Sequence, residues 1–375
     1  MSGKINVKDL SSLLSKSHKG FKGYNLNENN PTDVKDWIPT GSRWLDASIC
    51  KGRLAGIPVG KITEIAGESG VGKSYMAMQI AINAQKKDYN VIYFDSEMAI
   101  DSVFLEKAGC DLDNFLYVPA KSVENVLETI ETIMANSSHN LFIWDSLAFT
   151  PCETDLESDF NPTSSMALKP RILSKGLSKL LLPIAESQSA FVILNQLKTN
   201  IATGPGARIK MMMEPWVTPG GKSLIYAYSL RIWLTARKSK AARIQGDKGY
   251  DVGNEVKAKL QKSRFGTQNR VCSFNIVWGD YDNIGIMDEQ SWLEAIKESE
   301  HVTSGGWWKI QDVVKETEYT FRSAGFKEKI LEEPEFKEVV LRIMDEEVIE
   351  KFNQGEGDVE RFYKLDEDEE TVLKT

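Results

Sequence analysis

The chain has 375 residues, 41% of them hydrophobic and 27% charged, and a formal net charge of −8. This length exceeds that of an ordinary domain, so we expect one large core with smaller attachments. A polar N-terminus and the lack of a long apolar run argue against a secretory signal and a membrane span, which favours a cytoplasmic protein. Four scattered cysteines and three separated histidines argue against a disulfide framework and a zinc site.

The charge is divided unevenly along the chain. Residues 311–375 hold 20 Asp and Glu against 10 Lys and Arg, so this end carries −10. Residues 195–275 hold 15 Lys and Arg against 4 Asp and Glu, a local charge of +11. A basic region of this size suits a polyanion such as DNA, but charge alone does not separate that interpretation from an ordinary solvated face.

The predicted elements define an arm, a core and a C-terminal region. Residues 1–38 combine a short helix at 7–16 with a Gly- and Asn-rich stretch, which predicts an N-terminal arm. Residues 39–285 form the core, where short apolar runs predict strands at 61–66, 90–95, 140–145 and 190–195. Helical spacing predicts helices at 74–87, 123–135 and 165–188. This alternation predicts an α/β fold with a doubly wound, mostly parallel sheet.

The C-terminal region, residues 286–375, is charged and helical in pattern. We expect it to form a smaller α/β or α domain. It ends in an acidic run at 366–370, whose composition predicts disorder.

The strongest motif lies between the first predicted strand and the helix after it. Its pattern, G-x-x-x-x-G-K-S, comprises Gly67, Glu68, Ser69, Gly70, Val71, Gly72, Lys73 and Ser74. In such a loop backbone N–H groups surround the phosphates of ATP, Lys73 places a cation on the β and γ phosphates, and the Ser74 hydroxyl ligates Mg²⁺. A glycine-rich helix cap is the alternative, but the full motif between strand and helix favours a nucleotide site.

Polar residues at the ends of three other predicted strands fit the same site. Asp145 is placed to hold Mg²⁺ through water. Glu97 is placed to orient and polarise the attacking water, with Asp95 as the competing candidate. Gln196 can hydrogen-bond the γ-phosphate or that water. An ordinary polar strand end is the alternative for each, so these assignments depend on the phosphate loop.

A long segment, residues 198–219, follows the fourth predicted strand, and loops of this length are functional or disordered. Its cations suit phosphates, and its Met and Trp side chains suit wedging or stacking against bases, so it is the candidate site for single-stranded DNA. A partner-docking or merely flexible loop is the alternative. The candidate DNA contacts are Arg208, Lys210, Met211 and Trp216, then Gly220, Gly221 and Lys222 where the next helix begins.

Taken in order, these motifs resemble the RecA family. The matching stretches are 38–46, 60–67, the phosphate loop, 93–101, 145–146, 194–196 and 220–221. Their joint occurrence between about residues 38 and 280 is more specific than a phosphate loop alone. The short N-terminal arm and the long acidic end resemble phage recombinases of the UvsX type more than the cellular bacterial protein.

The resemblance implies an ATP-dependent DNA recombinase that forms helical filaments on single-stranded DNA and catalyses homologous pairing and strand exchange in recombination and repair. It implies DNA-dependent hydrolysis of ATP to ADP and phosphate, with Mg²⁺. The implied partners are single-stranded and double-stranded DNA, further copies of the chain, and single-strand-binding and mediator proteins. A phage origin would place the protein in the cytoplasm of a bacterial host.

The resemblance also assigns roles around the nucleotide. Glu97 becomes the catalytic glutamate, and Gln196 becomes the γ-phosphate sensor that couples nucleotide state to the loop after it. Phe104 replaces the aromatic residue that stacks on adenine, and any ring face can serve there. Lys262 and Arg264 resemble a basic pair that reaches a neighbour's ATP, with Arg in place of the second Lys.

Two DNA-binding loops are implied as well, the first at 154–166 and the second at 198–219, with Arg171 as a phosphate contact after the first. The second loop is several residues longer than the cellular pattern. The first loop region departs from the family because its acids would repel a phosphate backbone. Those acids are Glu153, Asp155, Glu157 and Asp159.

Two other classes of protein share some of these features. A hexameric DNA helicase motor has the same phosphate loop and an inter-subunit cation, but the pattern Lys262-Ser-Arg264, the paired glycines after the long loop and the lack of a recognisable primase-binding domain favour the recombinase. A nucleotide-switched scaffold without a DNA role is the third interpretation. The basic region at 195–275 argues against it.

Overall fold

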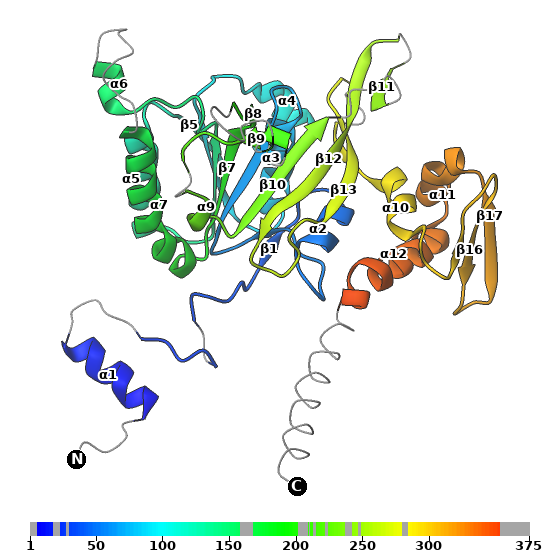
Figure 1. Ribbon diagram of the computed structural model, residues 1–375, viewed down its shortest axis with the longest axis horizontal. Helices are drawn as coiled ribbons and strands as arrows, with labels where there is room; N and C mark the ends of the chain where they lie inside the picture. The colour runs from blue at the N-terminus through cyan, green and yellow to red at the C-terminus, as the bar shows by residue number, and fades with distance from the viewer. Residues whose placement is uncertain are drawn as a thin grey trace.

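The computed structural model describes residues 6–17, 23–27, 30–157, 168–201, 209, 211–212, 215–221, 224–236, 242–246, 249–279 and 284–352. A large sheet lies at the centre of the molecule, with helices on its two faces (Figure 1). A short helix near the N-terminus lies apart from this core, and a smaller unit of helices and strands lies at its other side (Figure 1).

The central sheet of the described chain has ten strands. Its parallel part, in spatial order, consists of β10 (Leu230–Ala236), β3 (Ile62–Gly67), β7 (Ala190–Gln196), β6 (Asn140–Asp145), β4 (Asn90–Asp95) and β5 (Phe115–Pro119). The four predicted strands are β3, β4, β6 and β7, so the prediction of a mostly parallel α/β sheet is confirmed.

An antiparallel extension continues the sheet beyond β10, and the sequence did not predict it. It consists of β12 (Asp251–Ser263), β13 (Val271–Val277) and β14 (Gly285–Met287), with β11 (Arg243–Gln245) paired to β12. Because β12 runs opposite to β10, its last residue, Ser263, pairs with the first residue of β10, Leu230. The residues that follow β12 therefore lie at the amino edge of the parallel strands.

Two apolar cores sandwich the parallel strands, as expected for strands that are buried on both faces. Helices α3 (Lys73–Gln85) and α2 (Arg43–Ile49) pack on one face, where Ile80 and Leu45 join the side chains of β3 and β10. Helices α5 (Val123–Asn136), α7 (Leu168–Glu186) and α9 (Leu224–Ala227) cover the other face around Trp144. The helices predicted at 74–87 and 123–135 correspond to α3 and α5, and the one predicted at 165–188 contains α7.

Side-chain caps fix where several of these helices begin. The Ser122 hydroxyl accepts the N–H of Asn125 at the start of α5. Asp101 accepts the N–H groups of Val103 and Phe104 at the start of α4 (Ser102–Lys107). Such caps satisfy N–H groups that the helix itself leaves unpaired.

The C-terminal unit has its own apolar core, which includes Phe321, Phe326 and Phe336. Its elements are α10 (Glu289–Ile296), β15 (Val302–Thr303), β16 (Trp308–Asp312), β17 (Thr317–Phe321), α11 (Phe326–Glu332) and α12 (Pro334–Val348). Arg43 on α2 forms an ion pair with Asp345 on α12, which ties this unit to the sheet. The acidic run at 366–370 lies outside the described residues.

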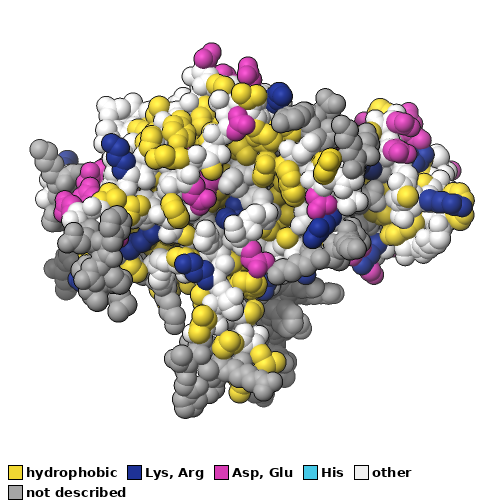
Figure 2. Space-filling view, turned by 90° about the horizontal axis from the view of Figure 1, so that it is seen from above, with side chains coloured by type: hydrophobic (Ala, Val, Ile, Leu, Met, Phe, Trp, Pro, Cys, Tyr) yellow, Lys and Arg dark blue, Asp and Glu magenta, His cyan; other side chains and the backbone are white. Residues whose placement is uncertain are grey.

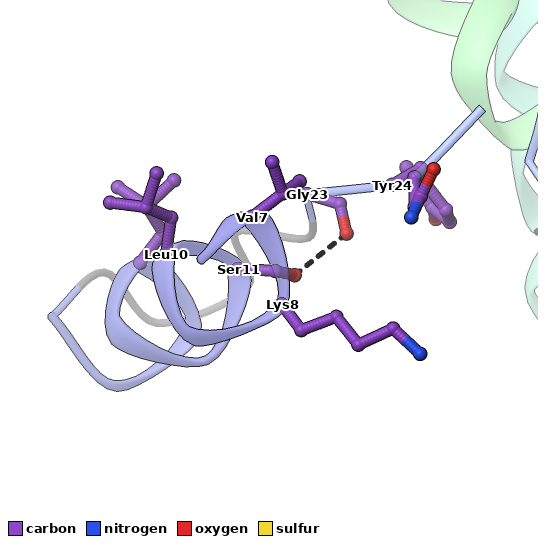
Figure 3. Close-up of a pocket in the computed structure, with 8 residues that line it drawn as sticks. Val7, Lys8, Leu10, Ser11, Gly23 and Tyr24 are labelled. Carbon is purple, nitrogen blue, oxygen red and sulfur yellow. Dashed lines mark hydrogen bonds between the residues drawn. The ribbon is translucent and has the colours of Figure 1, made fainter. Parts of the chain in front are cut away.

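The N-terminal helix predicted at 7–16 is α1 (Val7–Ser17). The Ser11 hydroxyl on α1 donates to the Gly23 carbonyl over 2.8 Å, which closes a small hollow beside the helix (Figure 3). Further on, β1 (Trp37–Ile38) pairs with β2 (Ile57–Pro58) beside the core. Within the described residues, no helix has the length and apolar character needed to cross a bilayer.

Candidate nucleotide site and DNA-binding surface

The phosphate loop connects the carboxyl end of β3 to the start of α3. Gly72 has φ of +99°, and a Cβ added there would lie 2.5 Å from Ile276 Cδ1 on β13. The left-handed backbone at this position favours glycine, and a Cβ would also force the Ile276 side chain to shift. The turn therefore directs the first N–H groups of α3 toward the mouth of the loop, where an anion would bind.

Lys73 is held across this loop. Its Nζ donates to the carbonyls of Gly67 over 3.2 Å and of Glu68 over 2.9 Å. Partial burial lowers the pKa of its ammonium, while the charges of Asp145 and Glu97 raise it. A phosphate in the loop would be a stronger partner for this cation than neutral carbonyls are.

Ser74 and Asp145 form the pair of oxygens predicted to hold the metal ion. The Ser74 hydroxyl donates to Asp145 Oδ2 over 2.6 Å, and the Tyr93 hydroxyl donates to the same oxygen over 2.7 Å. Burial raises the pKa of Asp145, and these two hydrogen bonds lower it. A hydroxyl beside one carboxylate fits Mg²⁺, which binds through one or two protein oxygens together with water and phosphate.

The two competing carboxylates after β4 have different surroundings. Asp95 is buried, and its carboxylate accepts the N–H groups of Glu97 and Met98, both over 2.9 Å, and of Ala99 over 3.0 Å. It therefore caps the turn that follows the strand. Glu97 is exposed to solvent, and its Oε1 accepts the Ser146 hydroxyl over 2.9 Å. The geometry thus favours Glu97 over Asp95 as the residue available to water.

Gln196 ends β7 directly beside the phosphate loop. It pairs in register with Gly67 on β3, and the N–H of the next residue, Leu197, donates to the Gly67 carbonyl over 3.0 Å. A movement of the phosphate loop at Gly67 would therefore displace the backbone of Leu197, where the 198–219 segment begins.

A cavity of about 210 Å³ opens beside Ser74 and contains Phe104, the predicted adenine-stacking residue. The Phe104 ring meets the Tyr75 ring edge to face, with centroids 5.2 Å apart. The Trp278 ring lies 6.1 Å from Tyr75. Sequence reasoning missed both residues. Tyr75, which lines the cavity, could have been found because it directly follows the motif. Trp278 packs on Tyr75 without lining the cavity, and nothing near it in the sequence points to this contact.

The cation pair lies far from the phosphate loop of its own chain. Lys262 Nζ donates to the carbonyls of Ile225 and Tyr228 over 2.5 and 2.6 Å, and Arg264 Nη2 donates to that of Tyr226 over 2.7 Å. The pair thus caps the end of α9 at the amino edge of the sheet, while the phosphate loop lies at the carboxyl edge. A strand the length of β3 separates the two edges by about 17 Å, so the structure does not bring the pair to its own loop.

The two ends of the 198–219 segment pair with each other and form a two-stranded ribbon. Strand β8 (Lys198–Thr199) pairs antiparallel with β9 (Trp216–Val217), so both legs of the loop leave the sheet beside Gln196. Among the predicted DNA contacts, Met211 is exposed and Trp216 is partly buried, while Arg208, Lys210 and Lys222 lie outside the described residues.

The paired glycines after this loop lead the chain into α9. Gly220 has φ of +103°, and a Cβ there would lie 2.3 Å from Leu224 Cδ1. Gly221 also has a positive φ, and its Cβ would lie 3.2 Å from Pro170 on α7. The glycines therefore serve the turn and the close approach of α9 to α7, whatever further role their N–H groups have.

The first predicted DNA loop is described only in part. A short helix, α6 (Glu153–Glu157), carries three of its four acids, and the fourth, Asp159, lies outside the described residues with 158–167. Arg171 is exposed on the first turn of α7. Figure 2 views the molecule from the end where β8, β9 and α4 lie in Figure 1, and the visible Lys and Arg side chains form separate spots there.

Comparison with known proteins shows which family the chain resembles. The RecA N-terminal domain family model matches residues 8–283. The chain is 30% identical over 278 residues to "Protein RecA" of a Nitratiruptor species, covering 74% of this chain and 75% of the relative. It is 30% identical over 304 residues to "Protein RecA" of Methylococcus capsulatus, covering 80% and 82%. A third relative, "Protein RecA" of Symbiobacterium thermophilum, is 29% identical over 280 residues, or 74% of each chain.

Proposed function

The chain belongs to the RecA family of ATP-dependent recombinases and DNA-dependent ATPases, and we propose that it hydrolyses ATP between adjacent subunits of a helical filament to control its hold on single-stranded DNA. One observation carries the proposal. The phosphate loop, Glu97 and Gln196 lie at the same edge of the sheet as the two legs of the 198–219 loop. A change at the γ-phosphate therefore has a short covalent route to the loop.

Each group at this edge has a distinct chemical task. Lys73 and the N–H groups of the phosphate loop bind the phosphates and offset their charge. Ser74 and Asp145 would hold Mg²⁺, which supplies further charge neutralisation when it is bound. Glu97 orients and polarises the attacking water, and the Ser146 hydroxyl keeps the Glu97 carboxylate facing the site.

The cation pair would complete the site of a neighbouring subunit. Lys262 and Arg264 sit at the amino edge of the sheet, where they cannot reach the phosphate loop of their own chain. Stacking copies of the chain head to tail would bring this edge against the carboxyl edge of the next copy. Cations at such an interface are shielded from water, where they stabilise a developing phosphate charge most strongly.

Two exposed features support assembly of this kind. Helix α1 presents Val7, Leu10 and Leu13 to solvent, and Figure 3 shows the Val7 and Leu10 side chains standing away from the helix. Strand β5 is one of the two outer strands of the sheet, and its Leu116 and Tyr117 side chains are exposed. An unpaired strand edge with apolar side chains favours pairing with another chain.

DNA would bind along the 198–219 loop, with phosphates on Arg208 and Lys210 and a base stacked on Trp216. Single-strand-binding and mediator proteins are proposed partners, and the cytoplasm is the proposed place of action. Replacing Arg208 and Lys210 with Ala should weaken binding to all sequences alike and flatten its salt dependence, because fewer counterions are released. An unchanged salt slope, measured by fluorescence anisotropy with an oligonucleotide, would move the DNA site elsewhere.

Electron microscopy with a non-hydrolysable ATP analogue and single-stranded DNA tests the proposal as a whole. Long helical filaments are the expected result. Closed rings would favour a hexameric helicase motor instead, and dispersed single particles would favour a scaffold without a DNA role.

A further inference from the structure

A buried polar cluster lies on three adjacent strands at the exit of the 198–219 loop. Arg231 on β10 donates through Nε to Glu64 Oε2 on β3 over 2.6 Å, and their side chains are only 6% and 1% exposed. Asn195 on β7 donates through Nδ2 to the other carboxylate oxygen of Glu64 over 2.9 Å. These residues are almost fully shielded from solvent, and none of them lines the cavity beside Ser74.

The same cluster holds the last residues of the loop. Arg231 Nη2 donates to the Thr218 hydroxyl over 3.0 Å, and Asn195 Nδ2 donates to the Pro219 carbonyl over 3.1 Å. On its other side, the Asn195 Oδ1 accepts the N–H of Gln196 over 2.9 Å. The cluster therefore touches both the exit leg of the loop and the backbone of the predicted γ-phosphate sensor.

The two legs of the loop thus have different anchors. The entry leg is bound to the phosphate loop through Leu197, whose N–H donates to the Gly67 carbonyl. The exit leg is bound to the buried cluster: Thr218 accepts from Arg231, and the Pro219 carbonyl accepts from Asn195. A displacement of Gln196 would move the entry leg relative to Thr218 and Pro219, and it would act on the β8–β9 ribbon that joins the two legs.

A buried ion pair is a poor source of stability, because desolvation of the two charges offsets most of their attraction. Two apolar side chains in place of Glu64 and Arg231 would fill the core at least as well, but they would leave the Thr218 hydroxyl without its donor and Asn195 without its carboxylate acceptor. The guanidinium fork also fixes direction, since it can donate to Glu64 and to Thr218 at once. These properties suit a cluster that holds the exit leg of the loop in a fixed position.

We propose that Glu64, Arg231 and Asn195 form a positioning cluster that fixes the exit leg of the DNA loop relative to Gln196, so that the nucleotide state sets the affinity for single-stranded DNA through it. This inference rests on the proposed function. It assigns a task to a buried ion pair that takes no part in binding or hydrolysing ATP.

The test is the ratio of single-stranded DNA affinities measured with a non-hydrolysable ATP analogue and with ADP. Arg231→Lys keeps a cation beside Glu64 but cannot also reach Thr218. Thr218→Val removes the acceptor from the other side. Each variant should lower the ratio about tenfold, as expected for one hydrogen bond to a charged group, and the double variant should lower it no further. DNA-independent hydrolysis by Arg231→Lys should stay unchanged.

Arg342→Lys is the matched control, because Arg342 donates to the buried Asp312 in the C-terminal unit over 2.6 Å. Its ratio should equal that of the wild type. A wild-type ratio in both test variants, or fully independent losses in the double variant, would overturn the inference. If Arg231→Lys unfolds, Thr218→Val alone decides. A wild-type chain whose DNA binding ignores the nucleotide would overturn the proposed function instead.

Discussion

The carboxyl edge and the amino edge of the central sheet carry two complementary groups of residues in the proposed ATPase site. At the carboxyl edge, the phosphate loop, Asp145, Glu97 and Gln196 lie at or just beyond the ends of four neighbouring parallel strands. At the amino edge, Lys262 and Arg264 end an antiparallel strand and donate to the carbonyls of α9. The first group binds a polyanion and the second offers cations. Strand direction keeps them apart within one subunit, and we propose that a head-to-tail neighbour brings them together.

The largest effect on ATP hydrolysis is expected from a substitution in the phosphate loop at the carboxyl edge. Lys73→Ala should abolish ATP binding or turnover, because it removes the cation that we propose binds the β and γ phosphates. Nucleotide binding by equilibrium dialysis and phosphate release would both be measured. Full turnover by this variant would show that the loop does not work as a phosphate cradle.

A change at Glu97 should separate binding from hydrolysis. Glu97→Gln should keep ATP binding and slow hydrolysis by about a hundredfold, since general-base assistance typically contributes that much. Asp95→Asn is the matched comparison. It should act through folding of the turn that Asp95 caps, measured as a lower Tm. If Glu97→Gln hydrolyses ATP normally and Asp95→Asn does not, the wrong carboxylate has been assigned.

Mixing experiments test whether the two edges meet between subunits. A Lys73→Ala chain has an intact cation pair, and a Lys262→Ala/Arg264→Ala chain has an intact phosphate loop. Mixed filaments should therefore recover part of the DNA-dependent hydrolysis that each variant lacks alone. No recovery at any mixing ratio, with co-assembly verified by a labelled subunit, would contradict a shared site.

The smallest expected effect is a dependence on pH at the amino edge. Burial, followed by the charges of Arg264 and Arg231, lowers the pKa of Lys262 to about 8 from its ordinary 10.5. The lysine is therefore charged below about pH 8 and loses its proton above it. DNA-dependent hydrolysis should fall a few-fold as the pH rises past this value. Lys262→Arg should extend activity to higher pH, and an identical pH profile for both proteins would exclude this role of Lys262.

The carboxyl edge was predictable because its signals are local. The residues from Gly67 to Ser74 form one continuous motif, and the strands before Glu97, Asp145 and Gln196 are short apolar runs that end in polar residues. Parallel strands bring such ends together, so the sequence order was enough to place them. The reason for choosing Glu97 over Asp95 was not available, because it depends on four backbone N–H groups that only the folded turn directs at Asp95.

The features that sequence reasoning missed depend on residues far apart in the chain. Trp278 reaches the Tyr75 ring only because β13 lies beside β12 in the antiparallel extension. Glu64 and Arg231 are separated by 167 positions, and each interrupts an apolar strand without matching any motif. The ribbon of β8 and β9 is two residues long on each side, too short for a periodic pattern.

The ribbon of β8 and β9 also bears on how the DNA loop can change between relatives. Because Lys198 is paired with Val217 and Thr199 with Trp216, the ends of the loop are joined before any DNA is bound. The entropy of closing a flexible loop grows only with the logarithm of its length, about 0.6 kcal/mol for each doubling. Insertions between Thr199 and Trp216 therefore cost the fold little and leave the register at Gln196 unchanged. Selection can lengthen or shorten the proposed DNA-binding segment without changing the pairing that holds its two ends.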